Sequence, residues 1–315
     1  MLSAPGTATP PPTAALPPLP GGSGAADPGL RPSPGPRTMP SGPVAVPSAA
    51  PPGTSSVAAP AAPPSSPPGP PAAPRILVSL ATYNERGNLA PLIAEIRKYA
   101  PNVDMLVVDD NSPDGTGRLA DELAAADPRI RVIHRPGKLG LGTATLAAMR
   151  YAIDNGYDYL QNMDADFSHP PRFLPGILAG MANHDVMIGS RYVKGGGTEN
   201  WPLARLVISR TLNTLVRFLF RMPVLDASGA FRCYRVSKLK VAHLERTLSR
   251  GYSFQQEVLF RCHLVGSRLG EYPIIFENRR EGKSKVNQKE AVRSIAMILW
   301  IGVNHFFGLE DYKAR

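Results

Sequence analysis

The 315-residue sequence has only two cysteines, Cys233 and Cys262. Their number excludes a disulfide framework and their spacing does not match a zinc site, which favours a reducing compartment. The six histidines show no paired spacing typical of metal ligands, and no Ser-His-Asp arrangement is visible. We therefore expect all of the histidines to be structural except His169, which we expect to support neighbouring site residues.

Long hydrophobic runs are also absent. No segment reaches the roughly 18 apolar residues that a membrane-spanning helix needs. The nearest candidate, residues 295–309, is interrupted by Asn304 and His305. The first residues have neither the basic start nor the apolar core of a signal peptide. We expect no membrane span and no signal peptide, but a chain that can lie on a bilayer surface.

Residues 1–74 contain only three charged side chains, Asp27, Arg31 and Arg37, and consist mainly of Pro, Ala, Gly, Ser and Thr. About two-thirds of the 35 prolines fall there. Such a segment cannot bury enough apolar surface to offset an ordering cost of about 1–2 kcal/mol per residue. The composition predicts a disordered Pro/Ala-rich tail over residues 1–74.

Negative charge is in deficit, with 25 Asp and Glu against 35 Lys and Arg, for a net charge of +10. Nearly all of that excess belongs to the part after residue 74. A basic surface suits phosphate-bearing ligands, nucleic acid or an anionic membrane, and does not choose between them.

From Arg75 onward the sequence alternates between short apolar runs and helical patterns. The runs predict strands at residues 76–80, 103–108, 130–134 and 157–163, with helices between them. This alternation predicts an α/β fold with a central, mostly parallel sheet. In such sheets, ligands bind beyond the carboxyl ends of the strands. Three of these ends carry polar pairs, which we expect to converge on one crevice: Tyr83 and Glu85, Asp109 and Asp110, Asp164 and Asp166.

The segment DADFSHPP, residues 164–171, gives the sharpest chemical signal. Asp164 and Asp166 flank one residue at a strand end, where both can reach one divalent ion. Carboxylate oxygens suit Mg²⁺ or Mn²⁺, which also bind diphosphates and neutralise the charge of a departing one. Helix capping is an equally good explanation for such a pair taken alone. For Asp110 we expect contacts with a base or ribose, and for Asp109 turn and capping chemistry is the competing explanation.

The second half, after about Gly189, predicts a different kind of structure: Arg-rich helical segments with short strands at residues 231–234 and 272–276. Arg191 is expected in a flexible polar loop. Arg205 and Ser209 are four residues apart in the amphipathic stretch 202–220, so they share a helix face. Guanidinium and hydroxyl groups together suit a phosphate clamp, although a solvated basic face is the alternative.

Two further segments leave their alternatives open. The basic run RREGKSK, residues 279–285, can close over a diphosphate or be a surface charge run. Residues 287–315 predict a C-terminal amphipathic helix whose apolar stretch, 291–309, packs on the domain or faces lipid.

Taken in order, eight segments resemble those of one family: ATYNERGNL, VDDNSPDGT, KLGLGTA, DADFSHPP, GSRYVKGG, DASGAFRCYR, GYSFQQE and RREGKSK. The chain resembles polyprenyl-phosphate (dolichol-phosphate) mannosyltransferases, which are family 2 glycosyltransferases with the GT-A fold. The resemblance covers about residues 75–286 and leaves out the tail and the last helix.

The resemblance implies a GDP-mannose donor, a polyprenyl phosphate acceptor and inversion at the anomeric carbon. It also implies a peripheral protein on the cytoplasmic face of a membrane, with no nucleic-acid partner. The implied nucleoside contacts are Tyr83, Glu85, Val108 and Asp110. The implied diphosphate and metal contacts are Asp164, Ala165 and Asp166, with Arg279 and Lys285 also on the donor diphosphate. The implied acceptor-phosphate contacts are Arg191, Arg205 and Ser209.

We expect Asp166, Arg191 and Arg205 to contribute most directly to catalysis. The nearest alternative keeps the reaction and changes the donor, for example to UDP-glucose. More remote alternatives are a sugar-phosphate nucleotidyltransferase and a non-catalytic binder of lipid or nucleic acid.

Overall fold

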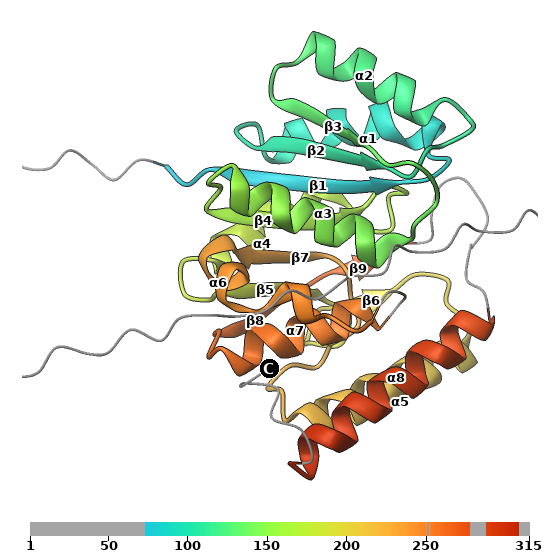
Figure 1. Cartoon of the computed structure of the whole chain (residues 1–315), viewed down its shortest axis with the longest axis vertical. Helices are drawn as coiled ribbons and strands as arrows, with labels where there is room; N and C mark the ends of the chain where they lie inside the picture. Colours follow the sequence, from blue (N-terminus) through green and yellow to red (C-terminus); the bar gives the residue numbers. More distant parts are fainter. Residues whose placement is uncertain (1–72, 250, 252, 278–287, 309–315) are drawn as a thin grey trace, which may run out of the picture. The chain divides into compact units, whose positions relative to one another are not determined.

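The computed structural model describes residues 73–249, 251, 253–277 and 288–308 (Figure 1). Of the predicted tail, only residues 73 and 74 are among the described residues. The basic run 279–285 lies wholly outside them.

A seven-stranded sheet forms the centre of the fold, in the order β3-β2-β1-β4-β7-β5-β8 (Figure 1). The described strands of this sheet are parallel to their neighbours except β7, which is antiparallel to both β4 and β5. The expected central, mostly parallel sheet is therefore confirmed. Its strands are β1 (Ile76–Thr82), β2 (Asp104–Asp109), β3 (Ile130–His134), β4 (Tyr159–Asp164), β5 (Val186–Ser190), β7 (Arg232–Arg235) and β8 (Leu269–Pro273).

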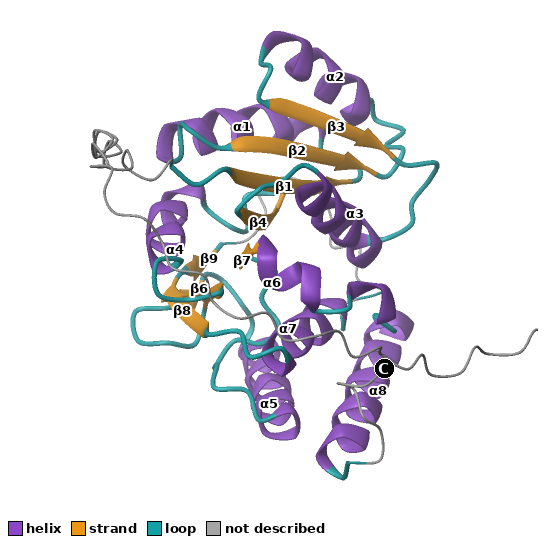
Figure 2. Ribbon diagram, turned by 60° about the vertical axis from the view of Figure 1, so that its left-hand side comes forward, coloured by secondary structure: helices purple, strands orange, loops and turns teal. Residues whose placement is uncertain are grey.

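Helices cover both faces of this sheet (Figure 2). On one face lie α1 (Arg86–Tyr99), α2 (Thr116–Ala126) and α4 (Leu174–Gly180). On the other lie α3 (Leu141–Asp154), α6 (Val236–Val241) and α7 (Phe254–Leu264). Short 3₁₀ turns span Pro171–Phe173 and Leu244–Arg246.

The alternation of side chains along each strand divides the core into two layers. In β1, Val78 and Leu80 pack toward α1, whereas Leu77 packs toward α3, because successive strand residues point to opposite faces. All three are fully buried. The near-continuous apolar sequence of β1 is therefore explained by a strand that is covered on both sides.

Two long helices form a pair outside the sheet layers, α5 (Leu203–Phe220) and α8 (Gln288–Phe306). They approach closely because Gly302 has no side chain: a Cβ placed there would lie 2.9 Å from the Cβ of Leu219. Ile298 and Ile301 of α8 join the core cluster that contains Phe220. In the described part of the chain, no helix combines the length and apolarity needed to cross a bilayer.

The second half differs from the sequence expectations in two respects. Strand β5 was not expected; it contains Gly189, a residue of low strand propensity, which is required because Phe231 and Ile274 approach to about 3 Å of a Cβ placed there. The strand predicted at residues 272–276 is in fact two. β8 ends at Pro273, and β9 (Ile275–Phe276) pairs in a separate small sheet with β6 (Gly197–Thr198).

Candidate active site

The register of the sheet brings the predicted polar residues to one edge. Ala81 of β1 lies opposite Val108 on one side and Asp164 on the other. The carboxyl ends of β2, β1 and β4 are therefore level, and the turns that follow them meet. The predicted convergence of three polar clusters at one edge is what the register produces.

Asp110 is the central buried carboxylate of the first cluster. Its Oδ1 lies 2.7 Å from Nη1 of Arg135, and both side chains are less than a tenth exposed. Its Oδ2 accepts hydrogen bonds from the backbone N–H groups of Leu139 and Gly140, at 3.0 and 2.9 Å. Gly140 has φ +94°, in the left-handed region that favours glycine. Asp110 thus shapes the glycine-containing turn between β3 and α3.

Tyr83 and Glu85 lie in the adjoining turn after β1. The Lys138 ammonium sits 4.4 Å from the centre of the Tyr83 ring, which ties this turn to the glycine-containing turn. The backbone N–H of Glu85 donates to Oγ1 of Thr116 at 2.9 Å. Lys138 and its neighbour Leu139 therefore connect Tyr83 with Asp110, and Glu85 lies in the same turn as Tyr83. Val108 lines a small cavity together with Ala81 and Asp164.

Asp109 and Asp114 have capping and turn contacts instead. Asp109 accepts from the Thr82 hydroxyl at 2.8 Å and from the Ser112 backbone N–H at 2.9 Å. Asp114 accepts from the Thr116 backbone N–H at 2.9 Å at the start of α2. These contacts agree with the turn and capping explanation given to Asp109 from the sequence.

The Asp164–Asp166 segment forms a tight, strained loop. Phe167 is buried with φ +65°, a backbone conformation that is costly for a bulky residue and is found mainly at functional sites. Oδ1 of Asp166 accepts from the Ser168 backbone N–H at 3.1 Å. The backbone N–H of Glu277 donates to the Ser168 carbonyl at 3.3 Å, so the end of β9 is attached to this loop.

His169 supports this loop from behind. Its Nδ1 accepts a hydrogen bond of 2.9 Å from the Asp164 backbone N–H, and its ring stacks on Phe231 with centroids 4.9 Å apart. Burial lowers the pKa of His169 below its ordinary value. The ring is therefore neutral at physiological pH, with its proton on Nε2. It orients the end of β4, as expected from the sequence.

The donor set fits a hard divalent cation that arrives with a nucleotide. Asp164 is about one-third exposed, whereas Asp166 is buried. Among the described residues, no group of three or more His, Cys, Asp or Glu is placed to hold a metal. Mg²⁺ is commonly bound through one or two carboxylates, with substrate phosphates and water supplying the remaining oxygens. Two aspartates are enough for that arrangement.

Arg191 opens the loop that follows β5, as expected from the sequence, but its side chain is buried. Its Nε and Nη2 each lie 2.7 Å from an oxygen of Asp226, which is fully buried. Nη2 also donates to Ser228 at 2.8 Å. Burial alone would raise the pKa of Asp226, but the Arg191 charge and hydrogen bonds outweigh it and hold that pKa below its ordinary value.

Arg205 and Ser209 lie on α5, and Arg205 shares the Trp201 ring with Arg191. The guanidinium carbons of Arg205 and Arg191 lie 3.8 and 5.4 Å from the centre of the Trp201 ring. The Tyr192 hydroxyl donates to Oγ of Ser209 at 2.6 Å. Trp201 and Tyr192 thus hold the three predicted acceptor-side residues in one group.

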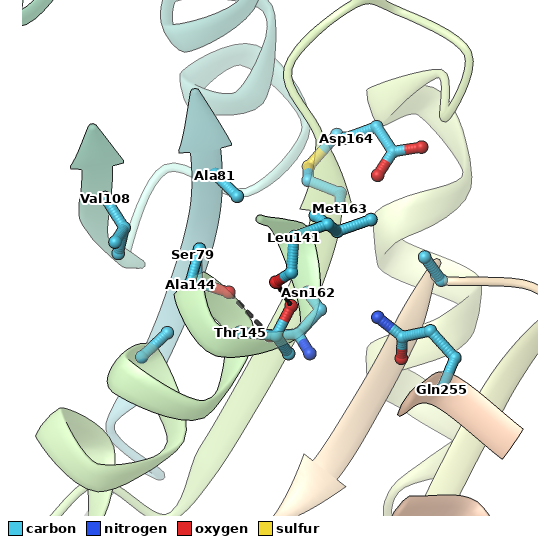
Figure 3. A pocket seen from close by; sticks show the side chains of 12 residues that line it. Ser79, Ala81, Val108, Leu141, Ala144, Thr145, Asn162, Met163, Asp164 and Gln255 are labelled. Carbon is cyan, nitrogen blue, oxygen red and sulfur yellow. Dashed lines mark hydrogen bonds between the residues drawn. The ribbon is translucent and has the colours of Figure 1, made fainter. Parts of the chain in front are cut away.

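Both halves of the site border one cavity of about 310 Å³. Asp164 and His169 line it from the β4 side, Arg191 from the β5 side, and α7 contributes Gln255. A smaller cavity of about 10 Å³ adjoins it, lined by residues including Asp164, Asn162 and Gln255 (Figure 3). Ligand pockets are commonly about 300–1,000 Å³, so the larger cavity has a suitable size.

Several residues at the site had no role in the sequence interpretation. Asp226, Ser228 and Gln255 lie inside the quoted segments DASGAFRCYR and GYSFQQE, but a buried ion pair has no local sequence signature. Trp201 lies outside all the quoted segments. Arg279 and Lys285 are outside the described residues, so their predicted contact with the donor diphosphate stays a prediction.

A sequence model of "Glycosyl transferase family 2" matches residues 78–241, which is more than half of the chain. The chain belongs to glycosyl transferase family 2. Polyprenol monophosphomannose synthase of Mycolicibacterium smegmatis is 45% identical over 227 residues, covering 70% of this chain and 86% of that protein. Undecaprenyl-phosphate mannosyltransferase of Micrococcus luteus is 42% identical over 213 residues, covering 68% and 88%.

The fold is also similar to that of solved glycosyltransferase structures. Glucosyl-3-phosphoglycerate synthase from Mycobacterium tuberculosis, in complex with Mn²⁺, uridine diphosphate and phosphoglyceric acid, superposes with a TM-score of 0.53 at 16% identity. The match covers 76% of this chain and 80% of that one. The same enzyme in complex with phosphoglyceric acid gives a TM-score of 0.52 at 17% identity. At this identity the likeness shows the GT-A-like fold alone.

Proposed function

We propose that this family 2 glycosyltransferase transfers mannose from GDP-mannose to a polyprenyl phosphate, with inversion at the anomeric carbon. One observation carries the proposal: Asp164 and Arg191, the residues expected to bind the donor diphosphate and the acceptor phosphate, line the same cavity. The names of the two relatives above 40% identity, one a polyprenol monophosphomannose synthase and one an undecaprenyl-phosphate mannosyltransferase, support the same reaction.

In this proposal the nucleoside is held by Asp110, Tyr83, Glu85 and Val108, and the diphosphate by Asp164, Ala165 and Asp166. Arg191, whose Nε and Nη2 bind Asp226 and Ser228, provides the positive charge for the acceptor phosphate. Arg205 and Ser209 bind the same phosphate from α5. Arg279 and Lys285 are assigned to the donor diphosphate by sequence alone.

In the reaction, an acceptor phosphate oxygen attacks the anomeric carbon as the bond from that carbon to the diphosphate breaks. The phosphate is already anionic at neutral pH, so the attack needs no general base, and neutral His169 takes no proton. Positioning and charge stabilisation by the arginines then supply most of the rate. Mg²⁺ or Mn²⁺ bound at Asp164 and Asp166 would neutralise charge on the departing diphosphate.

A membrane surface is the second part of the proposal, because the acceptor is a lipid. Leu203, Val207 and Phe218 are separated by four and eleven residues, close to one and three helical turns, so they share one exposed face of α5. α8 adds exposed Trp300, and exposed Phe307 directly follows this helix. The exposed residues Arg210 and Arg217 flank the α5 stripe. Apolar groups bordered by cations suit an anionic bilayer surface.

The test is a transfer assay with short-chain polyprenyl phosphate, Mg²⁺ and radiolabelled GDP-mannose. We expect a product that partitions into organic solvent and is labile to mild acid. UDP-glucose serves as the rival donor. Transfer from UDP-glucose but not from GDP-mannose would replace the donor in this proposal, and transfer from neither would overturn it.

A further inference from the structure

The first turn of α7 places a buried amide side chain at the wall of both cavities. Gln255 is the second residue of α7 and only 5% exposed. It lines the larger and the smaller cavity, in both cases together with Asp164. Figure 3 shows the amide end of Gln255 pointing toward the side of the pocket where Asn162 and Asp164 lie.

The Gln255 amide oxygen has no hydrogen-bond donor among the described residues. Oε1 is buried and accepts no hydrogen bond from any group in the part of the chain that the structure describes. An unpaired buried acceptor costs about 1–3 kcal/mol, and native proteins usually satisfy such atoms with protein, water or ligand. At a cavity wall, a ligand can supply the missing donor.

The backbone of Gln255 is held in place from below. Arg232, which is fully buried, donates from Nη1 to the Gln255 carbonyl at 2.5 Å and from Nη2 to the Ala227 carbonyl at 2.6 Å. The same guanidinium therefore anchors the start of α7 and the loop after Asp226. Gln255 is fixed relative to the Arg191–Asp226 pair, and such rigidity is what selection between similar ligands requires.

An unpaired donor lies across the smaller cavity. The Ser79 hydroxyl donates to Oδ1 of Asn162 at 2.5 Å, which fixes that amide (Figure 3). Nδ2 of Asn162 is buried and donates no hydrogen bond to a described residue. The space of about 10 Å³ between these groups is close to what a single water molecule needs. One hydroxyl group or one water fits it.

We propose that the side-chain amide of Gln255 binds a ring hydroxyl of the transferred hexose and so contributes to the choice of donor sugar. This rests on the proposed function, because it places the sugar between the diphosphate at Asp164 and the acceptor phosphate at Arg191. A hydroxyl both donates and accepts, as an amide does, so the two groups complement each other. Enzymes that hydrogen-bond a substrate hydroxyl discriminate strongly against analogues that lack it.

The experiment is a cycle that removes the amide and the hydroxyl separately and together. Gln255→Met keeps the side-chain volume and removes the hydrogen bonds. It is assayed with GDP-mannose and its 2-, 3-, 4- and 6-deoxy forms. We expect Gln255→Met to lower kcat/KM for GDP-mannose by about tenfold or more. Wild type should use one of the deoxy donors less well than GDP-mannose, whereas Gln255→Met should use that donor and GDP-mannose equally well.

Gln161→Met is the matched control. Gln161 is also fully buried with an unpaired Oε1 among the described residues, but it lines neither cavity. We expect this variant to keep the wild-type preference among the five donors even if it is less stable. Equal changes in preference in both variants would mean a structural effect and would overturn the proposal.

Two outcomes separate this inference from the proposed function. Additive effects for all four deoxy donors would overturn the role of Gln255 while leaving mannosyl transfer intact. If wild type uses UDP-glucose instead, the proposed donor fails, and the same cycle is run with deoxy forms of that sugar. Binding can also be measured without turnover, by comparing the Kd of the nucleoside diphosphate with the Kd of the nucleotide sugar. The ratio of the two reports the contribution of the sugar to binding, and Gln255→Met should move it toward one. Gln255→Asn is the second variant if Gln255→Met fails to fold.

Discussion

Each half of the site contains a buried Asp–Arg pair, but a different member of each pair contacts its surroundings. Asp110 of one pair binds loop amides, whereas Arg191 of the other borders the cavity. In the nucleotide half, one carboxylate oxygen of Asp110 accepts hydrogen bonds from the backbone amides of the adjoining loop. The other oxygen pairs with Arg135, which also donates to the Gly140 carbonyl. In the acceptor half, Asp226 is fully buried behind Arg191, which borders the cavity. In the proposed function, the first pair shapes a loop that binds the nucleoside, whereas the second holds a cation for the acceptor phosphate.

This difference matters because a buried ion pair contributes little net stability but is costly to break. The pairs are better understood as devices that fix one charged group for binding. Substitutions in the two halves should therefore separate into donor effects and acceptor effects. Five predictions test that separation, beginning with the largest expected effect.

Asp166→Ala removes a carboxylate on which the whole reaction depends. The diphosphate has to leave in every turnover, and Asp166 is proposed to help to bind the metal ion that stabilises it. We expect transfer to fall by about a thousandfold or more, the magnitude expected when charge stabilisation is lost from a transition state. The assay is mannosyl transfer at saturating Mg²⁺. Thermal unfolding should be close to wild type, and near-normal turnover would contradict the assignment of the metal site.

Asp226→Asn leaves the Arg191 guanidinium buried without its counter-charge. We expect the free energy of unfolding to fall by about 3 kcal/mol, measured by urea denaturation at pH 7. The control is Asp185→Asn, because Asp185 pairs with Arg235, which is more than a quarter exposed. Asp185→Asn should lower the free energy of unfolding clearly less than Asp226→Asn does. Equal losses would show that the burial of the Arg191–Asp226 pair does not increase the cost of breaking it.

The same pair predicts a pH dependence. The pKa of Asp226 is lower in the folded protein than the value of about 3.9 usual in unfolded chains. Its contribution to stability is therefore fully present above about pH 4 and is lost as the pH falls through the folded-state pKa. The difference in unfolding free energy between wild type and Asp226→Asn should therefore shrink on acidification. A constant difference would contradict the role of Arg191 in lowering this pKa.

Asp110→Asn should affect the donor alone. We expect KM for GDP-mannose to rise by about tenfold, since the hydrogen bonds of Oδ2 to the Leu139 and Gly140 amides weaken when the acceptor is neutral. KM for polyprenyl phosphate should stay unchanged, and Arg191→Lys should show the reverse pattern. Steady-state kinetics with each substrate varied in turn distinguishes the two, and parallel rises in both KM values would remove the distinction between the halves.

Phe218→Ser tests the outer side of the acceptor half and has the smallest expected effect. Removing one exposed aromatic ring should weaken binding to anionic vesicles by about three- to tenfold, in line with partial burial of an apolar side chain. Val241→Ser is the control, because Val241 is half exposed but lies on α6. Loss of vesicle binding in both variants, or in neither, would contradict a surface localised on α5 and α8.

The nucleotide half could largely be predicted from the sequence because its signals are local. Strand β3 (Ile130–His134) has the predicted bounds, and the polar turns follow strands whose parallel register forces them together. The acceptor half is built from contacts between distant segments. Arg191 and Asp226 lie in two different loops, and no periodic pattern in the sequence predicts that they pair. Strand β5 was missed because its glycine is required by packing against Phe231 and Ile274.

The hydrogen bond from the Glu277 backbone to Ser168 has a consequence for how the molecule forms. Glu277 lies more than a hundred residues after Ser168, and its side chain also pairs with Arg172 at 2.6 Å. Loops closed at such separation cost chain entropy and slow folding. The loop at Asp164 and Asp166 therefore reaches its final shape late, after β9 has docked. During synthesis on the ribosome, the parallel strands β1 to β4 can assemble first, and the loop at Asp164 and Asp166 is completed only once Glu277 has emerged.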